Sequence, residues 1–289
     1  MELSETLAAC RRFYDGSKTI IERELAFIRS NNISLIVGDT PPLCFEIAAQ
    51  TKIPSVSITN FTWDVIYRAY IDEHPEFLPL IEKITAFYGQ TTLALTLPYP
   101  CDTSMFPRQQ AIPWIARESS LTKAQARRKF NLPEHATIVL LSFGGLGLAR
   151  LPWERLKRQR AYLFVATGAG KKLDGNVVIL PDTQSQYEDL VRAADAIVTK
   201  PGYGIVADVL AHHLPILHTD RGEFPEYPRL VEALRDCATA GFISQTELLA
   251  GNLAPYLTRL LAERPNWPKI DLNGAQVAAS KILEMLDQV

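Results

Sequence analysis

Residues 199–204, Thr-Lys-Pro-Gly-Tyr-Gly, decide the fold, because they lie between an apolar run, 193–198, and an apolar-periodic segment, 205–211. This order predicts a buried strand, a glycine turn and a helix. Gly202 and Gly204, on either side of Tyr203, allow a sharp turn and a close approach of the backbone to a ligand. The new helix would present unpaired N–H groups and a positive dipole end to an anion. Lys200 adds a full positive charge at the same place.

A second glycine turn strengthens this prediction. The apolar run 138–141 is typical of a buried strand, and it is followed by Ser-Phe-Gly-Gly-Leu-Gly at 142–147. A third apolar run, 214–219, leads into the polar loop 220–227, and ligands of open parallel sheets bind at the carboxyl ends of such strands. Two glycine turns in one domain favour a diphosphate-sized ligand that bridges them, although any α/β protein needs glycines at such turns.

Composition limits the possible classes of function. The chain has 289 residues, of which 47% are hydrophobic and 21% charged, so it is long enough for two globular domains. The formal net charge of −2 gives no general attraction to nucleic acid or to an anionic membrane.

Four cysteines without metal-ligand spacing, and no apolar run long enough to span a membrane, predict a cytoplasmic protein. His212 and His213 are adjacent on a predicted helix and cannot share one metal ion, so no metal site is expected.

The pattern of elements predicts two α/β domains. Helical periodicity covers 3–29, and strands are predicted at 33–37, 55–59 and 92–97, with helices between them. A proline-rich connection, 98–120, marks the boundary. Beyond it, strands at 138–141, 161–166, 176–180, 195–199 and 214–218 alternate with helices, as in a doubly wound parallel sheet. We therefore expect domains at 1–115 and 121–272, followed by a C-terminal helix at 273–289.

These segments resemble a known family. The glycine turn after strand 138–141, together with AADAIVTKPGYGIVADVLAHHLPILHTDR at 193–221, is similar to the donor half of GT-B glycosyltransferases of the family 28 and UDP-sugar transferase group. LIVGDTPPLCFEIAAQTKIPSVSITNFTWDVIY at 35–67 and IPWIARESSLTKAQARRKF at 112–130 look like the glycosyltransferase-like region of plant arabinokinases and its bacterial relatives. The resemblance implies two Rossmann-like domains that bind a nucleotide-activated sugar, such as a UDP-sugar, as substrate.

The resemblance also implies roles for individual residues. Asp208 stands where the family usually has a glutamate that holds the ribose hydroxyls, and is one methylene shorter. Family members often have an Asp-Gln pair near the donor sugar, where this chain offers Arg221, Glu223 and Glu226. The diphosphate would be lined by the glycines of both turns and the helix that follows the second: Gly144, Gly145, Gly147, Gly202, Tyr203 and Gly204.

The chemistry of transfer adds further candidates. Backbone N–H groups, a helix dipole and the cations Lys200 and Arg221 can stabilise a leaving nucleoside diphosphate without a metal. The acceptor hydroxyl needs a general base from the first domain, and Asp39, at the end of a predicted strand, is the first candidate, with Asp64 the second. Each is more often a turn or cap residue.

The first domain differs from the family pattern. The chain starts in a helix, so the family's first strand and its glycine- and histidine-rich loop would lie upstream of Met1. We therefore expect a truncated first domain that transfers sugar poorly and whose sheet is covered by a partner chain or a second copy. Two other functions remain open: a nucleotide-sugar binding or regulatory module without turnover, and a nucleotide-sugar epimerase.

Overall fold

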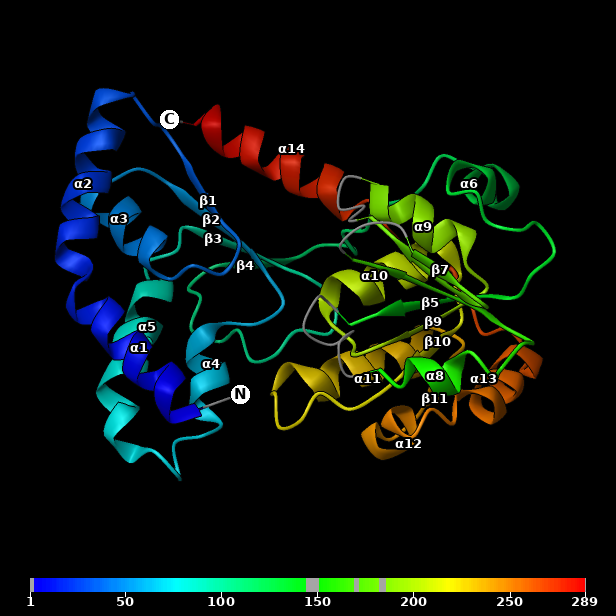
Figure 1. The fold of residues 1–289 in the computed structure, drawn as a ribbon. Coiled ribbons are helices and arrows are strands. Elements are labelled where there is room, and N and C mark those ends of the chain that lie inside the picture. Colours follow the sequence, from blue (N-terminus) through cyan, green and yellow to red (C-terminus); the bar gives the residue numbers. More distant parts are fainter. Residues whose placement is uncertain (1–2, 144–150, 169–171, 182–185, 289) are drawn as a thin grey trace. The chain divides into compact units, whose positions relative to one another are not determined.

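The computed structural model describes residues 3–143, 151–168, 172–181 and 186–288. The chain forms two compact units, and the C-terminal segment belongs to the first of them (Figure 1). Unit 1 contains Met1–Trp114 and Asn273–Val289, and unit 2 contains Ile115–Leu272. The helix expected as a separate segment at 273–289 is therefore part of unit 1, where the N–H of Gly274 donates to the carbonyl of Trp114 at 3.0 Å.

Unit 1 contains a parallel four-stranded sheet of order β1-β2-β3-β4. The three strands predicted from apolar runs are present as β1, β2 and β3, and β3 is buried along its whole length. The fourth strand was not predicted, since its Gln-Gln-Ala sequence is polar and mostly exposed. The strands are β1 (Ile36–Gly38), β2 (Ser55–Thr59), β3 (Leu93–Thr96) and β4 (Gln109–Ala111). The helices are α1 (Leu3–Asp15), α2 (Ser17–Ser30), α3 (Leu43–Thr51), α4 (Trp63–Arg68), α5 (Leu78–Tyr88) and α14 (Gly274–Leu286), with a 3₁₀ turn at Pro75–Phe77.

Unit 2 contains a seven-stranded sheet of order β11-β10-β9-β5-β6-β8-β7. All neighbouring strands are parallel except β7, which pairs with β8 as an antiparallel edge strand. The strands are β5 (Ile138–Ser142), β6 (Leu163–Thr167), β7 (Lys172–Asp174), β8 (Val177–Leu180), β9 (Ala196–Thr199), β10 (Ile216–His218) and β11 (Ala240–Phe242). The helices are α6 (Lys123–Lys129), α8 (Trp153–Leu156), α9 (Tyr187–Ala193), α10 (Tyr203–His212), α11 (Glu226–Cys237), α12 (Gln245–Leu249) and α13 (Leu253–Ala262).

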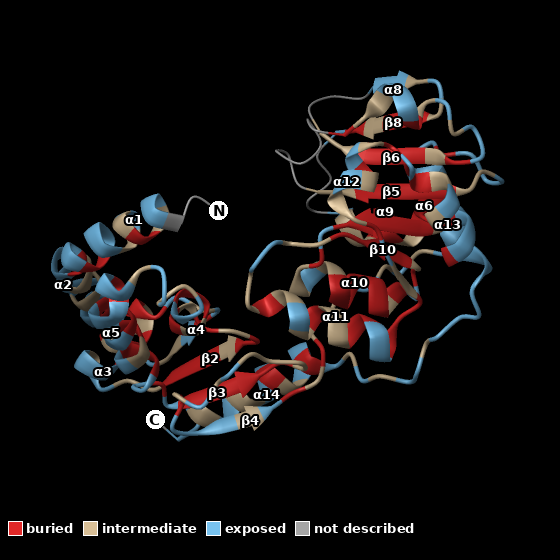
Figure 2. Ribbon diagram, turned by 90° about the horizontal axis from the view of Figure 1, so that it is seen from below, coloured by how far each residue is buried: buried red, intermediate tan, exposed pale blue. Residues whose placement is uncertain are grey.

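Helices cover both faces of the unit 2 sheet, as the alternating pattern predicted. On one face, alternate residues of β5, β9 and β10 pack against α8, α12 and α13 in one buried cluster. On the other face α9, α10 and α11 pack side by side (Figure 1). Figure 2 shows buried residues concentrated in the strands, with exposed residues on the outer sides of the helices. This arrangement brings the ends of β5, β9 and β10 to one edge of the sheet.

Candidate functional site

The turn between β9 and α10 lies at the carboxyl edge of the unit 2 sheet. The hydroxyl of Thr199 donates to the carbonyl of Ser142, which joins the end of β9 to the end of β5. Helix α10 has Gly202 as its N-cap, and no side chain caps its first N–H groups. These groups are therefore available to an anion.

The two glycines of this turn matter for space rather than for backbone conformation. Gly202 has φ of −131°, which other residues also adopt, and Gly204 lies within the helix. The sharp turn expected of them thus needs no glycine. Among the residues that the structure describes, a Cβ built on Gly204 would meet nothing within 4 Å, and one on Gly202 would meet only Nη1 of Arg221, at 4.0 Å. No described side chain therefore fills the space above either glycine.

Two cations border this open space. Arg221 is held in place by Glu226, whose side chain is 3% exposed and whose Oε2 accepts from Nη1 at 2.6 Å. The same nitrogen donates to the carbonyl of Pro201 at 3.3 Å, and the guanidinium lies 4.4 Å from the ring centre of Phe224. Lys200 is exposed, and no described residue pairs with its ammonium group. One cation is therefore preorganised and the other is free to move toward an anion.

Together these residues enclose a cavity of about 310 Å³, the lower end of the range for small-molecule sites. The structure thus brings Lys200, Gly202, Tyr203, Gly204 and Arg221 to one place, as predicted, although their roles remain predictions. The cavity is lined by Ser142, Phe143, Thr199, Lys200, Pro201, Gly202, Tyr203, Gly204, Ile205 and Arg221. Gly144, Gly145 and Gly147 lie outside the described residues, directly after Phe143.

Asp208 is buried and already paired. Its Oδ2 accepts from Nη2 of Arg117 at 2.7 Å, and its side chain is 3% exposed, whereas that of Arg117 is 56% exposed. The hydrogen bond to this carboxylate raises the pKa of Arg117. The predicted contact of Asp208 with ribose stays a prediction, but Arg117 was missed, because its segment carries no periodicity and was interpreted as a connection.

Glu223 lies outside the group of residues that line the cavity. It is exposed in the loop after Arg221, next to Gly222, which has φ of +70° and so needs a glycine. Glu226, from the same loop sequence, instead begins α11 and holds Arg221. The loop sequence offered both glutamates, but it did not indicate that Glu226 is the one that pairs with Arg221.

Unit 1 has its own polar cluster at the carboxyl ends of β1 and β2. Asp39 follows β1 directly and is exposed. Asp64, in the first turn of α4, is 2% exposed; its Oδ2 accepts from Thr85 at 2.7 Å, while Oδ1 has no partner among the described residues. Tyr88 connects the segments that follow the two strands. Its hydroxyl donates to the carbonyl of Thr40, after β1, at 2.6 Å and accepts from the N–H of Trp63, after β2, at 3.2 Å. Asp39 is thus accessible to an acceptor, and Asp64 is not.

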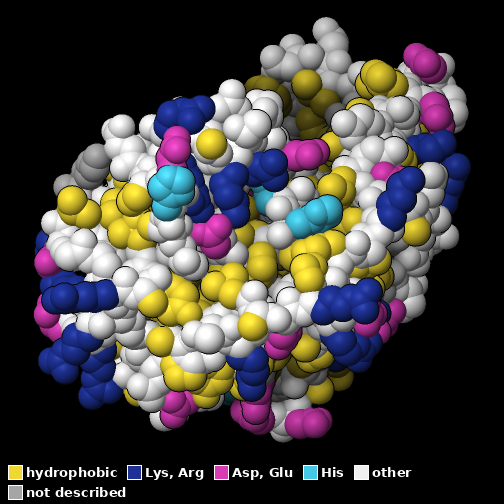
Figure 3. Space-filling view, turned by 90° about the vertical axis from the view of Figure 1, so that its right-hand side faces the viewer, with side chains coloured by type: hydrophobic (Ala, Val, Ile, Leu, Met, Phe, Trp, Pro, Cys, Tyr) yellow, Lys and Arg dark blue, Asp and Glu magenta, His cyan; other side chains and the backbone are white. Residues whose placement is uncertain are grey.

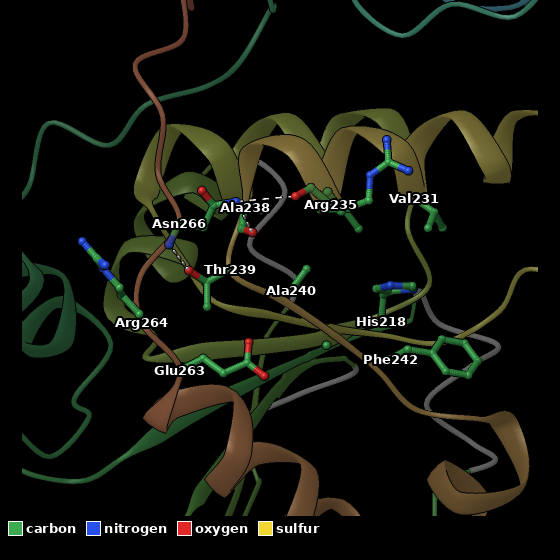
Figure 4. A pocket seen from close by; sticks show the side chains of 12 residues that line it. His218, Val231, Arg235, Ala238, Thr239, Ala240, Phe242, Glu263, Arg264 and Asn266 are labelled. Carbon is green, nitrogen blue, oxygen red and sulfur yellow. Dashed lines mark hydrogen bonds between the residues drawn. The ribbon is translucent and has the colours of Figure 1, made fainter.

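A second hollow lies beside the edge strand β11 (Figure 4). His218, at the end of β10, is one of the residues that line it. In Figure 4, Phe242 lies beside His218, and Arg235 of α11 lies above His218. The ring of His218 is 5.5 Å from that of Phe242 and 6.3 Å from that of Tyr227. Burial lowers the pKa of His218, and its Nδ1 has no partner among the described residues. The hollow contains none of the glycine-turn residues, so it is separate from the candidate site.

Other kinds of site find no support in the described part of the chain. No group of three or more His, Cys, Asp or Glu side chains there could hold a metal ion. None of the helices that the structure describes is long and apolar enough to cross a membrane. On the face shown in Figure 3, Lys and Arg side chains are interspersed with Asp and Glu. All four cysteines are free thiols.

The sequence is similar to parts of two known proteins. No protein-family model matches the chain. The chain is 26% identical to an L-arabinokinase of Arabidopsis thaliana over 92% of its own length, and 31% identical to a UDP-N-acetylglucosamine–N-acetylmuramyl-(pentapeptide) pyrophosphoryl-undecaprenol N-acetylglucosamine transferase of Desulforudis audaxviator over 32%. It spans 26% of the arabinokinase and 31% of the transferase.

Solved structures show the fold directly. The calicheamicin glycosyltransferase CalG4 matches 100% of the chain with a TM-score of 0.64 and 15% identity, and the chain covers 82% of it. The glycosyltransferase VinC, solved with dTDP, matches 99% with a TM-score of 0.62 and 16% identity, and 76% of it is covered. The chain has the GT-B fold. The predicted resemblance to GT-B glycosyltransferases and to plant arabinokinases is confirmed. In this GT-B fold, the cavity described above lies in unit 2.

Proposed function

We propose that unit 2 binds the nucleoside diphosphate of a nucleotide-activated sugar, with a UDP-sugar as the expected donor. The observation that carries this proposal is the cavity at the uncapped start of α10, which Gly202, Gly204 and Arg221 line. The uncapped N–H groups of α10, its helix dipole and two cations converge there, which is the arrangement that binds phosphate groups. Lys200 and Arg221 supply the charge that a divalent metal supplies in other sites, so binding is proposed to be independent of metal.

The chemistry proposed for the whole chain is transfer of the sugar to an acceptor hydroxyl. The acceptor oxygen forms a bond to the anomeric carbon, and the bond from that carbon to the diphosphate oxygen breaks. Negative charge then develops on the diphosphate, where Lys200, Arg221 and the α10 N–H groups stabilise it. The hydroxyl proton passes to a general base, and Asp39 is the proposed one because it is the accessible carboxylate of the two candidates.

A second candidate function is binding of the same ligand without turnover. It is favoured by the similarity to an L-arabinokinase, a relative named for a kinase activity, of which this chain spans 26%. In such a module unit 2 would keep its cavity, and Asp39 would have no catalytic role. An epimerase on the same scaffold has no observation in its favour.

Titration calorimetry with UDP in excess chelator tests the proposed binding site. We expect binding to persist in chelator and to weaken when Arg221 is replaced by alanine. The matched control is Arg229→Ala, which removes an arginine that pairs with Glu232 within α11. Absence of UDP binding would refute the proposal, and a strict requirement for magnesium would refute its metal-free form. Release of free sugar or glycosylated product from labelled UDP-sugars, and its loss in Asp39→Asn, separates the enzyme from the binding module.

A further inference from the structure

The next contact beyond the diphosphate is set by the geometry of α10. Gly204 lines the cavity, and Asp208 is four residues further along the helix, so both lie on the same helical face. Side chains of a helix lean toward its N-terminus, which directs Asp208 toward the open space above Gly204. A ligand whose diphosphate lies at the start of α10 and extends along this face therefore meets the surroundings of Asp208 next.

What the ligand meets there is a guanidinium rather than a carboxylate. The carboxylate of Asp208 is 3% exposed and one of its oxygens accepts from Arg117, whose own side chain is 56% exposed. The guanidinium also lies 5.8 Å from the ring centre of Tyr187, whose hydroxyl is 2.6 Å from Oγ of Ser142, a residue of the cavity wall. Among the described residues, Nη1 and Nε of Arg117 have no other hydrogen-bond partner.

Arg117 is held at this place by its backbone as well. Two residues on, the N–H of Ser119 donates to Nε2 of His212 at 3.0 Å, and its hydroxyl donates to Asp189 at 2.5 Å. His212 is in turn fixed by the carbonyl of Asp208, 2.7 Å from its Nδ1. The segment is thus tied to α9 and α10, so the guanidinium is preorganised beside the cavity rather than free in solvent.

We propose that Arg117 donates a hydrogen bond to the ribose ring of the nucleoside diphosphate. Asp208 is then a positioning residue that holds Arg117. This inference rests on the proposed function. A guanidinium has donors and no acceptor, so it recognises ring oxygens and hydroxyl oxygens as acceptors, where a free carboxylate would recognise hydroxyl hydrogens. Arg117 therefore contributes to the binding of UDP, which contains such a ring, and not to that of inorganic diphosphate, which contains none.

Calorimetry with UDP and with inorganic diphosphate tests this for Arg117→Ala, Asp208→Asn and the double variant. We expect Arg117→Ala to weaken UDP binding about 10-fold to 100-fold, the range for hydrogen bonds to a charged group, with diphosphate binding changed less than twofold. Asp208→Asn, whose amide oxygen can still accept from Arg117, should weaken UDP binding less than Arg117→Ala does. Adding Asp208→Asn to Arg117→Ala should cause no further loss of UDP affinity, because Asp208 acts through Arg117. Arg128→Ala, which removes an exposed arginine from α6, is the matched control.

The outcomes separate the inference from the proposed function. An equal loss for UDP and diphosphate, or no loss for either, would overturn the role of Arg117. A further loss of UDP affinity on adding Asp208→Asn to Arg117→Ala would show that Asp208 contacts the sugar itself. Failure of the unchanged protein to bind UDP would overturn both. If Arg117→Ala fails to fold because it leaves a buried carboxylate unpaired, the double variant, which buries no charge, is compared with Asp208→Asn alone.

Discussion

Replacement of Gly204 by alanine should stabilise the protein and weaken its ligand binding at the same time. The added methyl group meets no described residue within 4 Å, so we expect the folded state to accept it without strain. Glycine within a helix costs about 0.5–1 kcal/mol relative to alanine, and the variant should recover much of this. For a domain of about 150 residues, that corresponds to a rise in Tm of about 1–4 °C.

The same methyl group would occupy the space through which a diphosphate oxygen approaches the start of α10. Hydrogen bonds to an anion need a distance of about 2.9 Å, and a displacement of about 1 Å breaks them. Loss of one such bond to a charged group costs about 1.5–3 kcal/mol, so the Kd for UDP should rise about 10-fold to 100-fold. An ordinary core or surface substitution that raises Tm has no reason to do this.

Thermal melts and calorimetry on the same preparation check the two effects together. Gly16→Ala is the matched control, since Gly16 precedes α2 in unit 1 with φ of −83° and has its nearest atom at an ordinary contact distance of 3.4 Å. It should leave UDP affinity unchanged. A Gly204→Ala variant with raised Tm and unchanged UDP affinity would refute the reasoning, because the ligand then does not approach the β9–α10 turn.

Two further predictions concern stability. Burial lowers the pKa of His218 in the fold, so near and below the ordinary histidine pKa of about 6.5 the unfolded chain binds more protons than the folded one. Stability should therefore fall as pH drops through that value. His218→Phe should reduce this loss in denaturant titrations, and His135→Gln, at an exposed histidine, is the matched control. Asp195 accepts from Arg127 at 2.6 Å, and the arginine side chain is 7% exposed. Asp195→Ala should therefore cost about 3 kcal/mol of unfolding free energy, against less than about 1 kcal/mol for Glu134→Ala at an exposed pair; equal costs would contradict the argument.

Strands buried on both faces were predictable, and three of the edge strands in the described part of the chain were not. β3, β5 and β9 are continuous apolar runs, because a central parallel strand packs against helices on both sides. β4, β7 and β11 have three residues each and none that is buried, so no apolar run reveals them, whereas the edge strand β1 overlaps the apolar residues 35–37 and was predicted. The helices α11 and α13 carry a proline in their first turn, where proline is tolerated although it usually indicates a break.

The candidate site was predictable as far as it depends on strand ends. Lys200 and Arg221 follow neighbouring strands, so a parallel sheet places them together whatever the rest of the chain does. Arg117 depends instead on how a segment without regular structure lies against α10, and local sequence carries no signal for that. The same holds for Glu226, which the sequence offered near the donor sugar but whose hydrogen bond to Arg221 follows from where α11 begins.

The division of the chain has a consequence for its synthesis. Unit 2 is inserted between two parts of unit 1, and the two crossing points lie side by side, because the N–H of Gly274 meets the carbonyl of Trp114. A Cβ on Gly274 would lie 2.2 Å from the carbonyl oxygen of Pro113, so this closure requires a glycine. During translation unit 2 can finish folding while unit 1 still waits for α14. The start and end of unit 2 are close in space, so residues 115–272 form a segment that can be excised and expressed alone.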